Sequence, residues 1–199
     1  GGDEGSTAES EGDEHVRQVV VLISPASTHP GAGSCYVDNA ASEEDLAAID
    51  AVFARAPVAP PEKASASRRS YVCDVEGWLR KMVEAGAAAA GLQGRAFAHM
   101  RFLHYSESGG GLAPHVDLAR TDAQGRSTHT FILYLRDCAT GGGTALLDRL
   151  EGGPQAPRVL AEVQPRRGRL LIFPHRCPHK GVPTVDVPKL LLRGEFVLQ

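Results

Sequence analysis

The sequence of 199 residues lacks features that would each indicate a particular class of protein. It has no apolar run near the roughly 18–20 residues that a membrane-spanning helix needs. It also lacks a basic stripe, since 21 Lys and Arg stand against 24 Asp and Glu with a net charge of −3, which argues against a nucleic-acid-binding surface. Its 42% hydrophobic and 23% charged residues are ordinary for a soluble globular domain.

Cysteine is scarce too, and the cysteines are not clustered. No C-x-x-C pair occurs, which argues against a zinc knuckle and a dense disulfide scaffold. We expect free thiols, with one or two disulfides as the alternative for a secreted protein. The four are Cys35, Cys73, Cys138 and Cys177. The compartment stays open, with cytoplasm or nucleus favoured. Because the sequence begins with Gly-Gly rather than Met, we expect a trimmed chain that has lost any targeting segment.

The sequence divides into a short tail and one domain. Residues 1–15 are mainly Gly, Ser and acidic residues, a composition typical of a flexible tail. We assign residues 16–199 to a single domain, because this length suits one hydrophobic core. Near its start, the β-branched run VVVLIS at residues 19–24 predicts a buried strand.

Two helices are predicted in a supporting segment at about residues 42–92. Ser42 and Asp45, three residues apart, resemble a capping box at the start of the first helix. Residues 74–92 predict a second, amphipathic helix. The residues on its packed face are Trp78, Leu79, Met82 and Val83. The polar stretch between the two helices predicts a loop that runs through residue 69.

The sequence changes in character from about residue 95. Short apolar runs such as STHTFILYL and GRLLIFP follow one another, separated by glycine and proline. Closely spaced strands with turn signals between them are typical of a sandwich or jelly roll. We therefore predict an α+β, mainly β fold: a double-stranded β-helix (jelly roll) with its core at about residues 95–199, buttressed by the N-terminal helices.

Candidate metal ligands occur in two distant segments. His115 and Asp117 lie two positions apart in LAPHVDLAR, and FPHRCPHKGVP offers His175 or His179 as a third ligand. Two imidazoles and one carboxylate on one face of an octahedral ion bind Fe(II) and leave three positions open, which suits a bidentate cosubstrate and O₂. Zinc more often takes a tetrahedral set with one open position.

The order of these segments carries a resemblance to a known family. His115-Val116-Asp117, GGGTALL, PRRGRLLIFP, His179 and Lys189 follow one another, with Lys189 ten positions after His179. From about Ala96 to Leu198 this pattern resembles the Fe(II)/2-oxoglutarate-dependent oxygenases, most closely their prolyl-hydroxylase-like branch. The resemblance implies that His115, Asp117 and His179 bind the metal. It leaves His175 as a surface residue or one that supports the ligands.

The resemblance also implies a cation for the distal carboxylate of 2-oxoglutarate, because a buried anion without a partner is costly. Lys189 lies at the family interval, and Arg193, on the same strand face, remains its rival through its bidentate fork. Only one of them can hold the carboxylate directly, and a solvated strand-edge charge is the alternative for either. Tyr105 and Tyr134 stand where the family places cosubstrate-site tyrosines, with packing roles as the alternative.

Two further features flank the predicted mouth of the site. Arg126 is a candidate substrate-binding residue. The run at residues 107–111 (ESGGG) is either a mobile substrate loop or a turn that needs positive φ.

The predicted function is an Fe(II)- and 2-oxoglutarate-dependent dioxygenase that hydroxylates an unactivated C–H bond. O₂ is the second cosubstrate and ascorbate a further candidate cofactor. A prolyl residue in a peptide or protein is the favoured substrate; nucleic acid is disfavoured, a membrane is not expected, and the oligomeric state stays open. The alternatives are the same chemistry on a small molecule or on nucleic acid (a demethylase), another metal-dependent jelly-roll enzyme, and a non-catalytic binding module.

Overall fold

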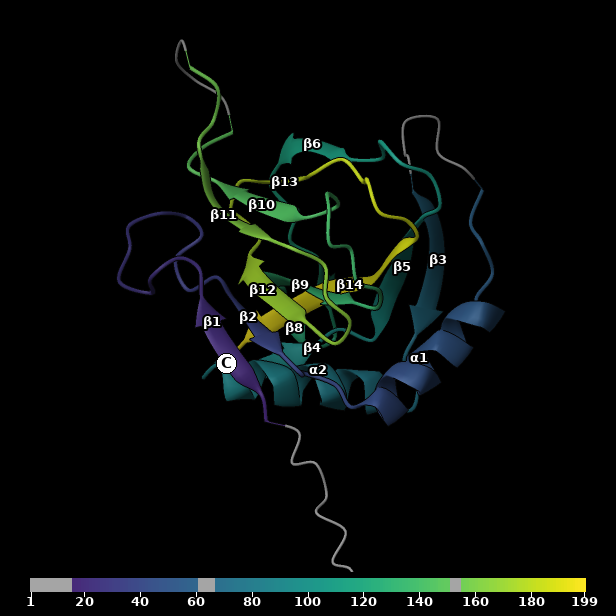
Figure 1. Cartoon of the computed structure of the whole chain (residues 1–199). Helices are drawn as coiled ribbons and strands as arrows, with labels where there is room; N and C mark the ends of the chain where they lie inside the picture. Colours follow the sequence, from purple (N-terminus) through teal and green to yellow (C-terminus); the bar gives the residue numbers. More distant parts are fainter. Residues whose placement is uncertain (1–15, 61–66, 151–154) are drawn as a thin grey trace, which may run out of the picture.

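A computed structural model of the chain describes residues 16–60, 67–150 and 155–199 (Figure 1). The tail predicted at residues 1–15 lies outside the described residues. The helices of the described part are α1 (Glu43–Arg55) and α2 (Trp78–Ala89). Its strands are β1 (Gln18–Val21), β2 (Cys35–Asp38), β3 (Arg68–Cys73), β4 (Gly94–Ala96), β5 (His99–Tyr105), β6 (Leu112–His115), β7 (Thr121–Asp122), β8 (Gly125–Arg126), β9 (His129–Tyr134), β10 (Thr144–Leu147), β11 (Val159–Val163), β12 (Leu170–Pro174), β13 (His179–Gly181) and β14 (Lys189–Leu198).

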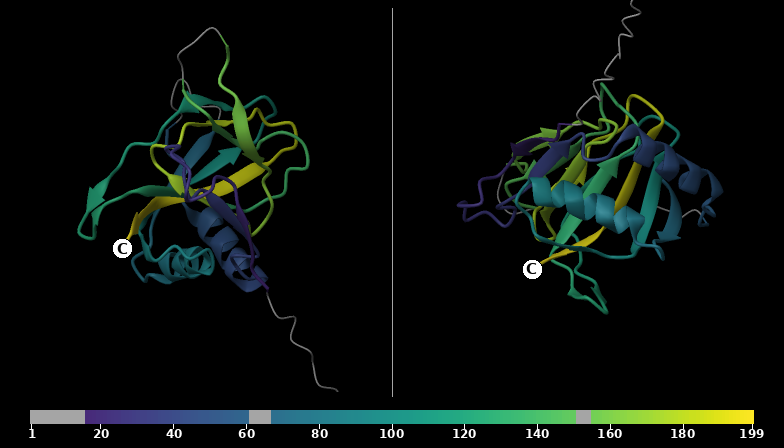
Figure 2. Two further views of the ribbon diagram at one scale, coloured as in Figure 1. Left: turned by 90° about the vertical axis from the view of Figure 1, so that its left-hand side faces the viewer. Right: turned by 90° about the horizontal axis from the view of Figure 1, so that it is seen from below.

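The strands form two facing antiparallel sheets and a small hairpin. The large sheet has the order β1-β2-β12-β9-β14-β5-β3, with β4 also paired to β14. The small sheet has the order β11-β10-β13-β6, and β7 pairs with β8 alone. Both helices lie across the outer face of the large sheet, on the side away from the small sheet (Figures 1 and 2). The fold is therefore the mainly β, helix-buttressed jelly roll that the sequence predicts.

The large sheet buries both of its faces, because side chains alternate along its central strands. On β9, Phe131 and Leu133 pack toward the helices, where Leu46 of α1 and Val83 of α2 contribute to the same cluster. The next residues, Ile132 and Tyr134, instead join the cluster between the sheets. This inner cluster also holds Leu146 of β10, Phe173 of β12 and Leu191 of β14.

The helices begin where polar side chains occupy their free N–H groups. The predicted capping box is confirmed: the Ser42 hydroxyl accepts from the Asp45 N–H, and the Asp45 carboxylate accepts from the Ser42 N–H. The second helix begins four residues later than predicted. The buried Asp74 carboxylate accepts from the backbone N–H groups of Gly77 and Arg80 at 3.0 and 2.9 Å, so residues 74–77 form its entry rather than its first turn.

Two predictions of local structure were wrong. The strand predicted as buried at residues 19–24 is β1, and all four of its residues are exposed, since it lies at the edge of the large sheet and pairs only with β2. The predicted loop through residue 69 is partly strand, because β3 pairs with β5 from Arg68 to Cys73. Its sequence RRSYVC carries polar residues on both faces, since Arg68 and Ser70 share the helix-facing side with Val72, and this hides the apolar alternation of a strand.

Neither helix in the described part of the chain has the length and apolar character that crossing a membrane requires.

Candidate metal centre

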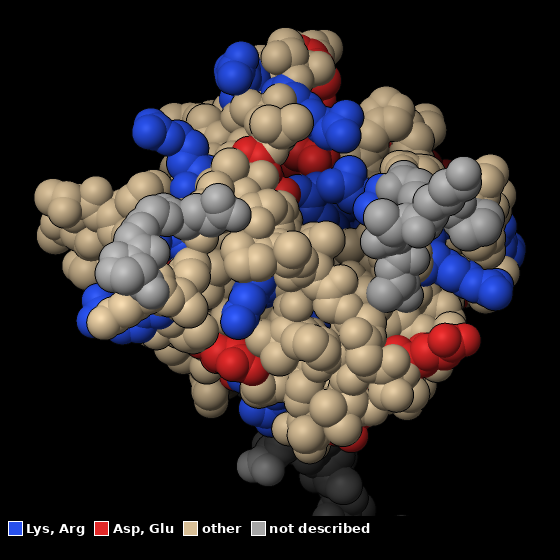
Figure 3. Space-filling view, turned by 90° about the horizontal axis from the view of Figure 1, so that it is seen from above, with Lys and Arg blue, Asp and Glu red and all other residues tan. Residues whose placement is uncertain are grey.

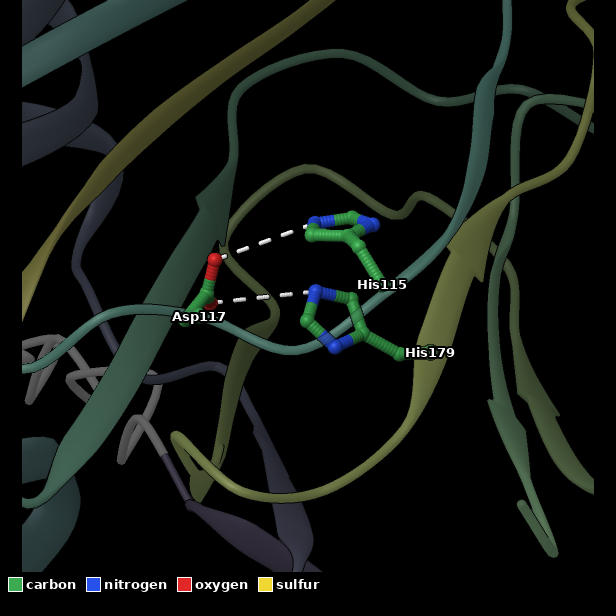
Figure 4. A group of neighbouring side chains, drawn as sticks. All are labelled: His115, Asp117 and His179. Carbon is green, nitrogen blue, oxygen red and sulfur yellow. Dashed lines mark ion pairs between the residues drawn. The ribbon is translucent and has the colours of Figure 1, made fainter. Parts of the chain in front are cut away.

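The three predicted ligands meet at the open end of the space between the sheets. His115 is the last residue of β6 and His179 the first of β13, and the two are direct partners in the antiparallel register of these strands. Asp117 follows in the loop after β6, where its N–H donates to the His175 carbonyl at 2.9 Å. The ligand atoms of the three side chains all lie within 4.8 Å of one another. Figure 4 shows both imidazoles turned toward the carboxylate.

Both histidines present a free lone pair to this point. The Nδ1 atom of His115 lies 2.9 Å from the Ala113 carbonyl, and that of His179 lies 2.9 Å from the Cys177 carbonyl. Because a carbonyl oxygen only accepts, each Nδ1 must carry the proton, so each Nε2 is left as an acceptor. Burial lowers the pKa of His179 to about 4, which keeps its ring neutral. Neutral imidazoles with fixed tautomers are what a metal ion needs.

The Asp117 carboxylate joins the two imidazoles. Its Oδ1 lies 3.7 Å from the His115 Nε2, and its Oδ2 lies 3.7 Å from the His179 Nε2. Burial by itself would raise the Asp117 pKa. The Arg193 guanidinium, His179 and a hydrogen bond from Thr130 outweigh this effect and hold the pKa at about 2. The carboxylate is therefore ionised throughout the physiological pH range and offers the negative charge that a divalent cation requires.

A chain of hydrogen bonds fixes the orientation of Asp117 from behind. Because the ionised carboxylate only accepts, the Thr130 hydroxyl donates to Asp117 Oδ2 at 2.5 Å. The Thr130 oxygen then accepts from His175 Nδ1 at 2.9 Å, which leaves the His175 Nε2 to accept from the Ser127 hydroxyl at 2.7 Å. The Ser127 oxygen in turn accepts from the Arg120 N–H at 2.9 Å. Ser127, His175 and Thr130 thus each accept one hydrogen bond and donate the next one along the chain toward Asp117.

His175 is accordingly not a surface residue. It is 3% exposed, and burial lowers its pKa, which favours the neutral ring that this hydrogen-bond chain requires. Of the two roles that the sequence left open, the structure places it behind the ligands.

Lys189 and Arg193 have different surroundings, although both side chains lie on the inner face of β14. Arg193 is already paired: its Nη2 lies 2.6 Å from Asp117 Oδ1 and its Nη1 lies 3.1 Å from Glu195. Lys189 is 3% exposed, and its Nζ lies 4.9 Å from the ring centroid of Tyr105. It makes no hydrogen bond or ion pair within the described part of the chain. Burial lowers its pKa to about 8.

The two predicted tyrosines also differ in their surroundings. Tyr105 lines a cavity of about 390 Å³ together with His115, Asp117 and Arg193. Tyr134 is fully buried in the inner cluster, and its hydroxyl lies 2.7 Å from the Thr144 hydroxyl. Tyr105 thus faces the candidate metal centre directly, whereas Tyr134 is held by packing and one hydrogen bond.

The comparisons with known proteins agree with this geometry. Residues 100–194 match the model of the 2OG-Fe(II) oxygenase superfamily. The match contains all three candidate ligands and both candidate cations. Residues 100–194 thus belong to the 2OG-Fe(II) oxygenase superfamily.

Solved structures share the jelly-roll fold at low sequence identity. A prolyl-4-hydroxylase from Pseudomonas putida has 19% identity and a TM-score of 0.56, over 86% of this chain and 94% of that one. A prolyl hydroxylase from Trichoplax adhaerens, bound to a hypoxia-inducible-factor peptide fragment, has 17% identity and a TM-score of 0.57, over 82% and 83%. HygX from Streptomyces hygroscopicus, with nickel and 2-oxoglutarate bound, has 11% identity and a TM-score of 0.61, over 84% and 83%. A search of curated proteins returns no matching sequence.

The two other predicted features differ in their distance from the centre, since Gly111 of the run at residues 107–111 lines the cavity beside the ligands and Arg126 does not. Arg126 is exposed on the β7–β8 hairpin, which projects from the body of the molecule (Figure 2), and it does not line the cavity beside the ligands. The run at residues 107–111 is a turn: Gly109 has a φ of +85°, and its N–H donates to the Thr184 carbonyl at 2.7 Å. A second bond, from the Gly110 N–H to the Thr184 hydroxyl, holds the turn against the loop after β13.

Three residues near the centre were not found from the sequence. Thr130 and Ser127 carry the hydrogen bonds behind Asp117, and Arg101 lines the cavity beside it. Because side chains alternate along a strand, Thr130 lies on the same face of β9 as Tyr134, and this spacing is the one sequence signal that could have pointed to it. Nothing in the sequence marks Ser127 or Arg101, because their positions depend on contacts between distant strands.

Proposed function

We propose that the chain is an Fe(II)- and 2-oxoglutarate-dependent dioxygenase that holds its iron through His115, Asp117 and His179. The observation that carries the proposal is the convergence of two imidazole lone pairs and an ionised carboxylate within 4.8 Å. The residues fit the metal in charge as well as in position, because both rings are locked as acceptors and Asp117 stays ionised. The structural superfamily makes Fe(II) the expected ion for this ligand set.

Lys189 is the residue we propose for the distal carboxylate of 2-oxoglutarate. A buried ammonium without an anionic partner is costly, so an incoming carboxylate stabilises it. Arg193 is the weaker candidate, because Asp117 and Glu195 already occupy both of its terminal nitrogens. Tyr105, whose ring lies against the Lys189 ammonium, shields this pair from water. The carbon stem of Lys189 is positioned by Gly142, where a Cβ would come within 3.3 Å of its Cδ.

Bound Fe(II) and 2-oxoglutarate would supply the oxidising power to hydroxylate an unactivated C–H bond with O₂, yielding succinate and CO₂. The chain's own residues contribute geometry to this reaction. Thr130 and Arg193 hold the two oxygens of Asp117 in place, and the carbonyls of Ala113 and Cys177 hold the imidazoles. A prolyl residue in a peptide is the proposed substrate. The spacing of Lys189 after His179 and the fold shared with two prolyl hydroxylases support it.

The experiment is incubation of the protein with Fe(II), 2-oxoglutarate, O₂, ascorbate and a panel of proline-containing peptides. We expect stoichiometric succinate and a gain of one oxygen on proline, located by mass spectrometry. His115→Ala should abolish both products, whereas His104→Ala, on the helix-facing side of β5, should retain succinate formation. Succinate without a modified peptide would leave the oxygenase but refute the prolyl substrate. Wild-type turnover by His115→Ala would refute the metal site.

A further inference from the structure

A second cavity adjoins the candidate metal centre along β3, β5 and β14. It has a volume of about 530 Å³ and shares Arg69, Arg101 and Arg193 with the cavity that contains His115 and Asp117. Arg120 and Glu195 also line it. We call this cavity, defined by these four arginines and Glu195, the arginine groove. Seen from above, basic and acidic side chains gather around a hollow in the surface (Figure 3).

The groove places like charges directly opposite each other. Arg101 of β5 and Arg193 of β14 are partners in the antiparallel register, so both guanidiniums lie on the same face of the sheet. Like charges in this arrangement destabilise a sheet. The arrangement is tolerated when an anion lies between or above the two cations.

The acidic residues of the site neutralise only part of this charge. Arg193 is paired with Asp117 and Glu195, and Glu195 is shared with Arg120, whose Nε lies 3.6 Å away. Arg101 forms no hydrogen bond or ion pair with any described residue. Burial lowers the pKa of Arg101 to about 10; Arg193 and Arg120 add to this effect, and the charges of Glu195 and Asp117 oppose it in part. Arg101 therefore remains charged at neutral pH, without a direct bond to either carboxylate.

The surface beside Arg101 suits an extended chain. Tyr71 of β3 is the cross-strand neighbour of Arg101 on its other side, and its side chain is 53% exposed. The exposed Tyr71 ring offers an apolar contact, and the unpaired Arg101 guanidinium beside it can donate two parallel hydrogen bonds to a carboxylate. The groove therefore has the features of a binding subsite as well as an excess of positive charge.

We propose that the arginine groove binds an acidic side chain of a peptide substrate, with Arg101 as the residue that recognises its carboxylate. This inference rests on the proposed peptide substrate and specifies that the substrate is acidic. The hydroxylated segment carries Asp or Glu next to the modified residue. Nucleic acid fits less well. A phosphate backbone is held by a track of many cations, whereas here the excess charge is confined to one groove of a chain with net charge −3.

The test measures binding without turnover, on protein loaded with Fe(II) and 2-oxoglutarate in the absence of O₂. Fluorescence anisotropy compares proline peptides that differ only by Glu or Gln at positions flanking the proline. We expect the wild-type protein to bind the best Glu peptide at least tenfold more tightly than its Gln counterpart. Arg101→Gln should reduce this ratio to about twofold or less, and Arg101→Lys, which keeps the charge but loses the fork, should give an intermediate ratio.

Arg55→Gln is the matched control, since it removes the same charge from an exposed position in the last turn of α1, outside the groove, and should leave the ratio unchanged. The inference is overturned if Arg101→Gln keeps the wild-type ratio, if no peptide of the panel shows a Glu preference, or if a single-stranded oligonucleotide binds more tightly than every peptide. It is also overturned if Arg101→Gln weakens the binding of 2-oxoglutarate rather than the binding of the Glu peptide. Melting temperature and 2-oxoglutarate affinity, measured on the same samples, test the fold and the proposed oxygenase separately.

Discussion

The two faces of β14 serve different purposes, although their residues alternate along one strand. Leu190, Leu192 and Phe196 point toward the helices and are almost fully buried among apolar side chains. On the inner face the alternate positions are Lys189, Leu191, Arg193 and Glu195, of which three are charged and all are buried. Apolar packing on the helix-facing side stabilises the sheet. On the inner side, the burial of charged side chains is unfavourable for stability, but it places these side chains at the candidate site. On β14, therefore, the helix-facing side supplies most of the apolar packing, whereas on the inner side only Leu191 joins the apolar cluster between the sheets.

The largest effect on stability is expected on the helix-facing side. Leu192→Ala removes a fully buried side chain and should cost about 2–5 kcal/mol of unfolding free energy. Iron and 2-oxoglutarate affinities at 20 °C should stay near wild type, because no ligand touches that face. Thermal unfolding and ligand titration measure the two quantities, and Leu118→Ala, at a position 83% exposed, is the control. A loss of ligand affinity in the folded variant would refute the division between the two faces.

The next effect concerns Lys189 on the inner face. Lys189→Met should weaken 2-oxoglutarate binding by about 2 kcal/mol or more, roughly 30-fold, because the cosubstrate carboxylate loses its buried cation. Lys81→Met, an exposed charge on α2, is the control. Isothermal titration of iron-loaded protein without O₂ measures the effect. If Arg193→Gln abolished 2-oxoglutarate binding while Lys189→Met did not, the roles of the two cations would have to be exchanged.

The lowered pKa of Lys189 also predicts that the affinity for 2-oxoglutarate falls at high pH. Burial lowers its pKa to about 8, so the ammonium is present below that pH and is lost as the pH rises through it. Since only the charged form pairs with a carboxylate, 2-oxoglutarate affinity should be constant below pH 8 and fall by up to tenfold per pH unit above it. Lys189→Arg should remove this dependence, because a guanidinium stays charged. An affinity that is flat to pH 9.5 in the wild type would contradict the assignment.

The last of these effects is expected behind Asp117, on the affinity for the metal rather than for 2-oxoglutarate. Thr130→Val keeps the shape of the side chain but removes the donor to Asp117, and the loss of such a supporting bond typically lowers metal affinity by about 10–100-fold. Thr121→Val, on the exposed β7 hairpin, should have no effect. Competition with a metal chelator measures the affinity. Unchanged affinity in Thr130→Val would mean that the hydrogen-bond chain through His175 does not support the metal.

The sequence predicted the fold, and it also named three candidate ligands that the structure brings within 4.8 Å of one another. Ser42 and Asp45 mark the first helix by a spacing of three, and His115 and Asp117 adopt their relation within one turn of chain. The sequence does not show that β1 lies at the edge of the sheet. Its valines have the apolar character of a buried strand, and only the strand order places them at the edge. Strand β3 did not show the apolar alternation by which strands are recognised, because polar residues lie on both of its faces.

The sequence alone does not decide whether Lys189 or Arg193 binds the distal carboxylate of 2-oxoglutarate. Both cations lie on the same face of β14, four residues apart, so spacing along the strand cannot separate their roles. Their surroundings differ only because the loop after β6 brings Asp117 to Arg193, while β5 brings Tyr105 to Lys189. Contacts of this kind depend on the register of strands distant in the sequence. The position of Arg101 opposite Arg193 has the same origin.

Anaerobic titration of Fe(II) in the presence of 2-oxoglutarate tests the metal site most directly. We predict that the wild-type protein binds one Fe(II) with a visible metal-to-ligand charge-transfer band, and that Asp117→Asn, although folded, shows no such band. Asp122→Asn, an aspartate on the β7 hairpin, should behave as the wild type. A wild-type protein without the band, or an Asp117→Asn variant that retains it, would contradict the assignment of these three side chains to an iron centre.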